Sequence, residues 1–231
     1  MLTLIALVAS LAQADQAAKP PLQMMTYQMV FLRNGPNAAE KSPDADNVQQ
    51  AHLEFLAKLN HERINLIYGP FADAGDLRGI AVLDVPDAER ARKLFAEDPH
   101  VKAGHLIVEV RPWMGPKGWF QPPADTDVTH PDALERLVFG FLMRGPAAPL
   151  PEGEGQRLQK AHLAYMDDLH KQGKLVMAGP FMEDTPWRGV VVYRVATVDE
   201  AKQLAANDPL VKVGRLVLDA HPWMTFRGIL R

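Results

Sequence analysis

The chain has 231 residues, of which 47% are hydrophobic and 23% are charged, and this balance excludes a wholly disordered protein. The formal net charge is −3, with 25 basic and 28 acidic residues. Without a basic excess to neutralise phosphates, nucleic acid is not expected as a partner. The absence of cysteine removes disulfides, thiolate catalysis, Fe–S clusters and cysteine-bound zinc.

The N-terminal segment is predicted to direct export. Residues 2–11 (LTLIALVASL) are almost unbroken apolar sequence, and Ala-Gln-Ala follows in the pattern of a signal cleavage site. The apolar run is shorter than the roughly 20 residues that span a bilayer, so no membrane span is expected. We therefore predict a signal peptide at residues 1–14, a proline-containing linker at residues 15–24 and an exported protein, periplasmic or extracellular. The alternative is a buried N-terminal helix in a cytoplasmic protein.

The following part of the chain alternates short apolar runs with helical patterns. Residues 27–33 (YQMVFLR) form an apolar run that stops at Gly-Pro, which is typical of a buried strand. The next segment spaces Val48, Phe55 and Leu59 on one helical face. The predicted elements are strand, helix, strand, strand, helix and strand, at residues 27–33, 47–63, 64–68, 79–85, 87–97 and 105–111.

An internal repeat is the strongest signal, because the chain aligns with itself without a gap when it is shifted by about 110 residues. About 30 of about 94 aligned positions are identical, against a chance level of roughly 6%. The matched segments include Ala51-His52-Leu53 with Ala161-His162-Leu163, Gly69-Pro70-Phe71 with Gly179-Pro180-Phe181, Arg78-Gly79 with Arg188-Gly189, and Asp98-Pro99 with Asp208-Pro209. We therefore expect two similar domains, at residues 25–118 and 135–231, joined by a Pro-rich linker at residues 119–134.

The element order βαββαβ predicts a ferredoxin-like fold of the α+β class for each domain. Such a sheet carries both helices on one face, and its other apolar face must be covered. Two fused copies provide that cover by packing sheet against sheet about a pseudo-twofold axis. The tandem is thus expected to form an intramolecular pseudo-dimer, and further oligomerisation is left open.

Two of the eight histidines occupy matched positions on an apolar helix face. His52 lies four residues after Val48, and His162 lies four residues after Leu158, so both lie on the apolar face of a helix. An imidazole that is buried there needs a hydrogen-bond partner. Asp98 and Asp208 are the matched candidates, because a residue before proline leaves helical geometry. A carboxylate that orients an imidazole suits acid–base catalysis near neutral pH, whereas a purely structural hydrogen bond is the alternative. The other six histidines have no counterpart and are expected on the solvated surface.

Two further pairs of matched residues are candidates for ligand binding. Phe71 and Phe181 follow the Gly-Pro turn and are candidates for a pocket wall beside the histidine, or for core anchors. Arg78 and Arg188 are candidates for holding a substrate carboxylate, or for surface ion pairs. The sequence has no His-Glu-x-x-His motif and no nucleophile-elbow serine, and we expect neither a metal nor a cofactor.

These motifs resemble the YCII-related family. The resemblance rests on Ala-His-Leu in the first helix, Gly-Pro-Phe after the second strand, an Asp-Pro-x-Val-Lys-x-Gly segment and Pro-Trp in the last strand, and it covers nearly all of both copies. It implies a dimeric α/β barrel with a His–Asp pair in a cleft, here His52 with Asp98 and His162 with Asp208. Similar proteins include muconolactone isomerase-like and dehydrochlorinase-type enzymes that act on small ring compounds without metal.

Two functions remain open on the sequence. One is a cofactor-free isomerase or lyase that moves a proton on a small carboxylated or cyclic substrate. The other is a non-catalytic module that binds a small ligand or a partner, with structural His–Asp pairs. A cavity of roughly 300 Å³ or more beside the imidazole would favour the enzyme, and solid packing around it would favour the module.

Overall fold

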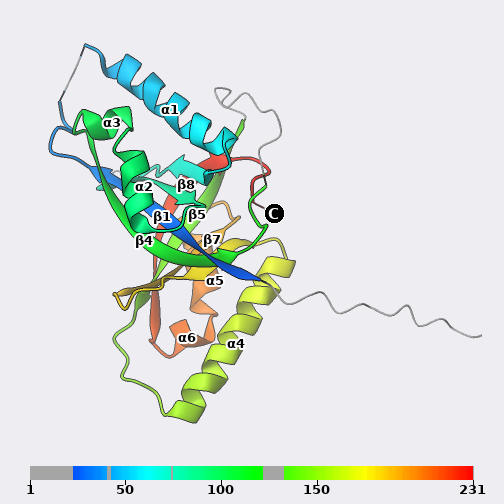
Figure 1. Ribbon diagram of the computed structural model, residues 1–231. Helices are drawn as coiled ribbons and strands as arrows, with labels where there is room; N and C mark the ends of the chain where they lie inside the picture. The colour runs from blue at the N-terminus through cyan, green and yellow to red at the C-terminus, as the bar shows by residue number, and fades with distance from the viewer. Residues whose placement is uncertain (1–22, 41–42, 74, 122–132, 231) are drawn as a thin grey trace, which may run out of the picture.

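The computed structural model describes residues 23–40, 43–73, 75–121 and 133–230 (Figure 1). The predicted signal peptide lies outside these residues, as do most of the first linker and the centre of the second. No described helix is long and apolar enough to cross a bilayer.

The described chain consists of two halves with the same element order. The first half contains β1 (Met24–Asn34), α1 (Ala45–His61), β2 (Asn65–Pro70), β3 (Leu77–Leu83), α2 (Ala88–Phe95), α3 (Pro99–Lys102) and β4 (Leu106–Pro116). The second half contains β5 (Leu134–Arg144), α4 (Glu152–Lys171), β6 (Leu175–Pro180), β7 (Trp187–Tyr193), α5 (Val198–Ala206), α6 (Pro209–Lys212) and β8 (Leu216–Phe226). The predicted βαββαβ order is confirmed in both halves, with a short extra helix before each last strand.

Each half forms one antiparallel sheet, with strand order β2-β3-β1-β4 in the first half and β6-β7-β5-β8 in the second. This is the order of the ferredoxin-like fold, which confirms the predicted α+β class. Helices α1, α2 and α3 cover one outer side of the pair of sheets, and α4, α5 and α6 lie on the other (Figure 1). The inner faces meet in a shared aromatic core, where the Phe31 and Phe141 rings are 5.9 Å apart.

The two sheets are joined at both pairs of edges, which closes a barrel. At the joint of β2 and β8, the Ala72 N–H donates to the Pro222 carbonyl at 2.9 Å. At the joint of β6 and β4, the Met182 N–H donates to the Pro112 carbonyl at 3.0 Å. Fully buried Trp223 donates from Nε1 to the Gly69 carbonyl at 3.0 Å. The matched Trp113 donates in the same way to Gly179. The expected intramolecular pseudo-dimer is therefore present.

Candidate functional site

Helix periodicity brings the matched histidines into the layer between helix and sheet. In α1 the buried side chains are His52, Leu56, Leu59 and Asn60, which recur at helical spacing. His162 lies at the same place in α4. Each imidazole therefore points inward, His52 toward the start of α3 and His162 toward the start of α6.

The carboxylates reach this layer because each begins a short helix. Asp98 has extended backbone angles (φ −62°, ψ 129°), as the following proline requires, and its Oδ1 accepts the His100 N–H at 2.8 Å. Asp208 caps α6 in the same way, accepting the Leu210 N–H at 2.8 Å. In each case the other oxygen, Oδ2, is left to face the histidine.

The structure brings both predicted pairs into hydrogen-bond contact. His52 Nδ1 lies 2.7 Å from Asp98 Oδ2, and His162 Nδ1 lies 2.6 Å from Asp208 Oδ2. Both carboxylates are buried, while each histidine retains 8% exposure. Because Nδ1 is engaged and no hydrogen bond within the described residues uses Nε2 of His162, this second nitrogen can meet a ligand.

In the first half, further polar side chains cover the pair. The His100 ring packs edge-on against His52, with 5.0 Å between ring centroids. Its Nδ1 lies 3.1 Å from His105 Nδ1, and its Nε2 lies 3.0 Å from Gln49 Oε1. Burial, together with the neighbouring imidazoles of His52 and His105, lowers the pKa of His100, against an opposing effect of Asp98. The first pair is thus covered by a chain of hydrogen-bonded side chains.

In the second half a cationic pocket lies at the matched position, and the His162 side chain is as exposed as that of His52, 11% in each case. Leu210 and Arg215 stand where the first half has His100 and His105. A cavity of about 560 Å³ lies here, within the usual size range of small-molecule sites. Its polar lining comprises Arg144, Gln159, Asp184, Arg188 and Arg215, and its apolar lining includes Pro149, Leu150, Leu210 and Leu216.

The pocket adjoins the second His–Asp pair without including it. Gln159 lies three residues before His162 on α4, and the Leu210 amide is the one that Asp208 accepts. Arg144 and Arg188 both form ion pairs with Asp184, so three guanidiniums face a single carboxylate. The pocket therefore carries a net positive charge suited to an anion.

The four residues predicted to bind ligand are divided between two places. Arg188 lines the cationic pocket, whereas Arg78 is exposed and lines neither of the two cavities found. Phe71 is paired with Trp223, and Phe181 with Trp113, across the joint between the sheets. Both phenylalanines are buried there as core residues, and Phe71 packs edge-on against His221 at 5.7 Å between ring centroids, because the residue after β2 or β6 faces the other half of the barrel.

The comparisons with known proteins bear on the whole chain. The model of the YCII-related domain matches residues 25–114 and 141–219, which together make up most of the sequence. The chain belongs to the YCII-related family. Both copies are matched, which confirms the tandem arrangement. No curated protein matches this YCII-related chain.

Solved structures extend the comparison to the fold of this YCII-related protein. A heme-binding protein from Thermus thermophilus superposes with a TM-score of 0.53 over 89% of this chain and 92% of its own, at 13% identity. A candidate chlorite dismutase gives 0.54 over 89% and 94%, at 10% identity. A candidate monooxygenase from Lactobacillus acidophilus gives 0.50 over 89% and 99%, at 11% identity. At these identities the likeness establishes the dimeric α/β barrel fold alone.

Four histidines that were expected on the surface of this YCII-related protein are instead half-buried and hydrogen-bonded. They are His100 and His105, described above, His170, whose Nδ1 lies 2.9 Å from the Leu175 carbonyl oxygen, and His221, whose Nδ1 lies 2.6 Å from Asp73 Oδ2 of the other half. The repeat concealed them, because their counterparts are Leu210, Arg215, Asn60 and Arg111. Tyr165 was also missed; its hydroxyl donates to the Leu204 carbonyl at 2.8 Å, and burial followed by the nearby Asp208 charge raises its pKa.

Proposed function

We propose that the second half of the molecule is an acid–base site for a small carboxylated substrate, with isomerase- or lyase-type chemistry. His162 would move the proton, Asp208 would hold the imidazole, and Arg188 would bind the carboxylate. The observation that carries the proposal is the position of the arginine-lined cavity directly beside the His162–Asp208 pair.

The hydrogen-bond pattern supports these roles. A carboxylate on Nδ1 fixes the ring orientation and the tautomer, which leaves Nε2 as the group that takes or returns a proton. Arg144, Arg188 and Arg215 supply donors for an anionic group, and planar guanidiniums bind carboxylates with two parallel hydrogen bonds. Gln159 and Leu210 are the lining residues that lie nearest to the pair along the chain.

Heme binding, which is described for one structural neighbour, is not proposed for this chain. Heme iron is held by His, Cys, Met or Tyr, and the described residues that line the larger cavity include none of these. The smaller cavity contains His221 but measures only about 190 Å³. The donor set and the available space therefore do not fit a heme.

A non-catalytic module remains the second candidate, and the first half favours it. Asp98 is fully buried, caps α3 and holds His52, so the pair fastens α1 to α3. His100 covers the imidazole, and neither cavity is lined by residues of this helix pair. A structural role accounts for the first pair, but it does not account for the arginine-lined cavity of the second half.

Deuterium exchange tests the proposal without knowledge of the full reaction. The full chain would be incubated in D₂O with a panel of small lactone acids and arylacetic acids, and NMR would measure deuterium incorporation at the carbon next to the carboxylate. We expect His162→Gln to lower the exchange rate by roughly 10²- to 10⁴-fold, with the melting temperature retained. Arg188→Ala should weaken binding of the same acid, since one guanidinium is removed from its pocket.

Matched variants separate this result from a general effect. His61→Gln and Arg92→Ala change exposed residues of the first half and should leave exchange and binding unchanged. His52→Gln reports whether the first half also turns over substrate. Exchange that is equally fast in the His162→Gln protein would remove the catalytic assignment and leave the binding module.

A further inference from the structure

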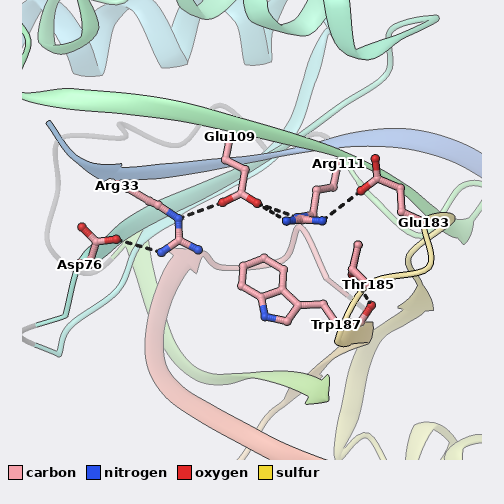
Figure 2. A network of polar contacts seen from close by, with 7 residues as sticks. All are labelled: Arg33, Asp76, Glu109, Arg111, Glu183, Thr185 and Trp187. Carbon is pink, nitrogen blue, oxygen red and sulfur yellow. Dashed lines mark hydrogen bonds and ion pairs between the residues drawn. The ribbon is translucent and has the colours of Figure 1, made fainter. Parts of the chain in front are cut away.

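Two places between the sheets, which we call the first and the second opening, correspond to each other in the repeat but carry different side chains. At the first opening a chain of ion pairs crosses the joint between the halves (Figure 2). Arg33 contacts Asp76 and Glu109, both at 3.0 Å, and Arg111 contacts Glu109 at 2.7 Å and Glu183 at 3.0 Å. Each carboxylate in this network of ion pairs therefore contacts at least one guanidinium.

The second opening keeps only part of this arrangement. The repeat places Met143, Pro186, Asp219, His221 and Asp73 at the positions of Arg33, Asp76, Glu109, Arg111 and Glu183. Strand register supports the match, since Arg33 pairs with Leu77 and Met143 pairs with Trp187 in the same way. The cation that Arg33 provides to Glu109 thus has no counterpart beside Asp219.

Asp219 is accordingly the least neutralised carboxylate of the second opening. Its one polar contact among the described residues is His221 Nε2, at 3.3 Å, and its side chain is 60% exposed. His221 itself is held by Asp73 of the other half, at 2.6 Å from Nδ1. His221 thus faces two carboxylates, and the nearer of them is Asp73.

A cavity of about 190 Å³ opens beside these residues, between the sheets. Phe141 and Trp187 line it with their rings stacked at 4.7 Å between centroids, and the guanidiniums of Arg33 and Arg111 lie over the Trp187 ring at 5.6 and 4.9 Å. Leu77 also lines it, at the position where the other half carries the larger Trp187. Three aspartates face one arginine in the lining, and that arginine, Arg33, is already paired with Asp76 and Glu109.

We propose that this inter-sheet cavity binds a small organic cation that carries one ring, of the amidinium or guanidinium class. The planar cation supplies to Asp219 the charge that Arg33 supplies to Glu109, and its ring rests against Leu77 and the edge of the Phe141–Trp187 stack. A volume below the roughly 300 Å³ of drug-sized sites limits the ligand to a single ring. Both halves contribute side chains, so the site exists only in the tandem. It is separate from the His162 pocket and does not depend on the function proposed there.

Three probes of nearly the same shape test the charge preference in the full chain. Calorimetric titration would compare benzamidine, a cation, with neutral benzamide and anionic benzoate. We expect measurable binding for benzamidine alone. Asp219→Asn should weaken benzamidine about two- to fivefold, as removal of one partly exposed ion-pair partner does. Met143→Arg should weaken it at least about tenfold, because a tethered guanidinium then occupies the place of the ligand cation.

Asp168→Asn is the matched control, since it removes the same charge from the exposed surface of α4 and should leave benzamidine binding unchanged. Thermal melting of each variant checks that it is folded, and Asp219→Asn decides the matter if Met143→Arg does not fold. The proposal is overturned if benzamidine does not bind, if benzamide or benzoate binds equally well, or if Asp219→Asn binds benzamidine like the unchanged protein.

Discussion

Asp98 and Asp208 each perform two tasks with two oxygens. One oxygen accepts a backbone N–H at the start of a four-residue helix, and the other holds an imidazole. The two tasks support each other, because a carboxylate fixed by the helix cap cannot turn away from the histidine. The repeat, the helical stripe and the Asp-Pro sequence together predicted these contacts. What surrounds each pair was not predictable, since it depends on unmatched residues such as His100 and Leu210.

Glu109 is the residue through which acid should weaken the joint between the halves. Burial alone would raise its pKa, but hydrogen bonds and charges from Arg33 and Arg111 outweigh burial and hold the pKa below its ordinary value of 4.5. Because this pKa is lower in the folded than in the unfolded chain, ionised Glu109 stabilises the fold above about pH 4.5. That contribution is lost as the pH falls through the folded-state value.

Glu109→Gln should therefore show a shallower fall in the free energy of unfolding between about pH 5.5 and pH 3.5 than the unchanged chain. Urea titrations at several pH values measure this slope. Glu62→Gln, at the exposed end of α1, is the control and should retain the original slope. An unaltered pH dependence in Glu109→Gln would show that its ion pairs contribute nothing to stability.

At the scale of elements, the outer strands decide how closely the two sheets meet. A Cβ added to Gly69 at the end of β2 would lie 1.7 Å from the Met224 carbonyl oxygen of β8. The matched Gly179 of β6 would meet the Met114 carbonyl oxygen of β4 at 1.9 Å. Real Cβ atoms do not approach backbone so closely, so glycine at these positions is required for the barrel to close.

Gly69→Ala should lower the free energy of unfolding by about 3 kcal/mol or more, because backbone on both sides must move apart. Gly153→Ala is the matched control on α4, where an added Cβ meets nothing within 4 Å. The control should be neutral or stabilise the protein by up to about 1 kcal/mol, since alanine favours the helix. Equal stability of the two variants in urea would contradict the close approach of β2 and β8.

The sequence predicted the elements better than their ends. The last strands were expected to stop at residues 111 and 221, but they continue to Pro116 and Phe226. Proline is tolerated at Pro112 because β4 is an edge strand, and its carbonyl accepts a hydrogen bond from Met182 of the other half. The short helices α3 and α6 were not predicted, since four residues carry too little periodicity to be recognised.

In the molecule as a whole, the fold follows from the duplicated sequence, and the sites follow from matched positions at which the two copies carry different side chains. The matched tryptophans Trp113 and Trp223 close the barrel symmetrically, and the repeat was enough to predict that arrangement. The two cavities lie where the copies carry different side chains. Leu210 in place of His100 and Leu77 in place of Trp187 are the two changes concerned. A fused chain allows this divergence, since its halves can change independently, whereas the two subunits of a homodimer must remain identical.

Each half, made as a separate chain, should expose apolar surface that is covered in the tandem. Residues 23–121 alone would expose the sheet face that carries Phe31, Phe71 and Trp113, all of which are buried in the tandem. Exposed apolar patches of this kind drive association, so each half should self-associate or aggregate. Mixing it with residues 133–231 should restore a one-to-one complex with the mass of the full chain, because unlike residues of the two halves meet at the joint, such as Arg111 with Glu183 and His221 with Asp73.

Light scattering of each half and of the mixture measures these masses, with the full chain as the reference. Circular dichroism shows whether each half retains its helices. Soluble, folded monomers of both halves, which do not combine when mixed, would mean that the sheets do not depend on one another for cover. The shared core and the inter-sheet cavity would then lose their physical basis, because both require side chains from each half.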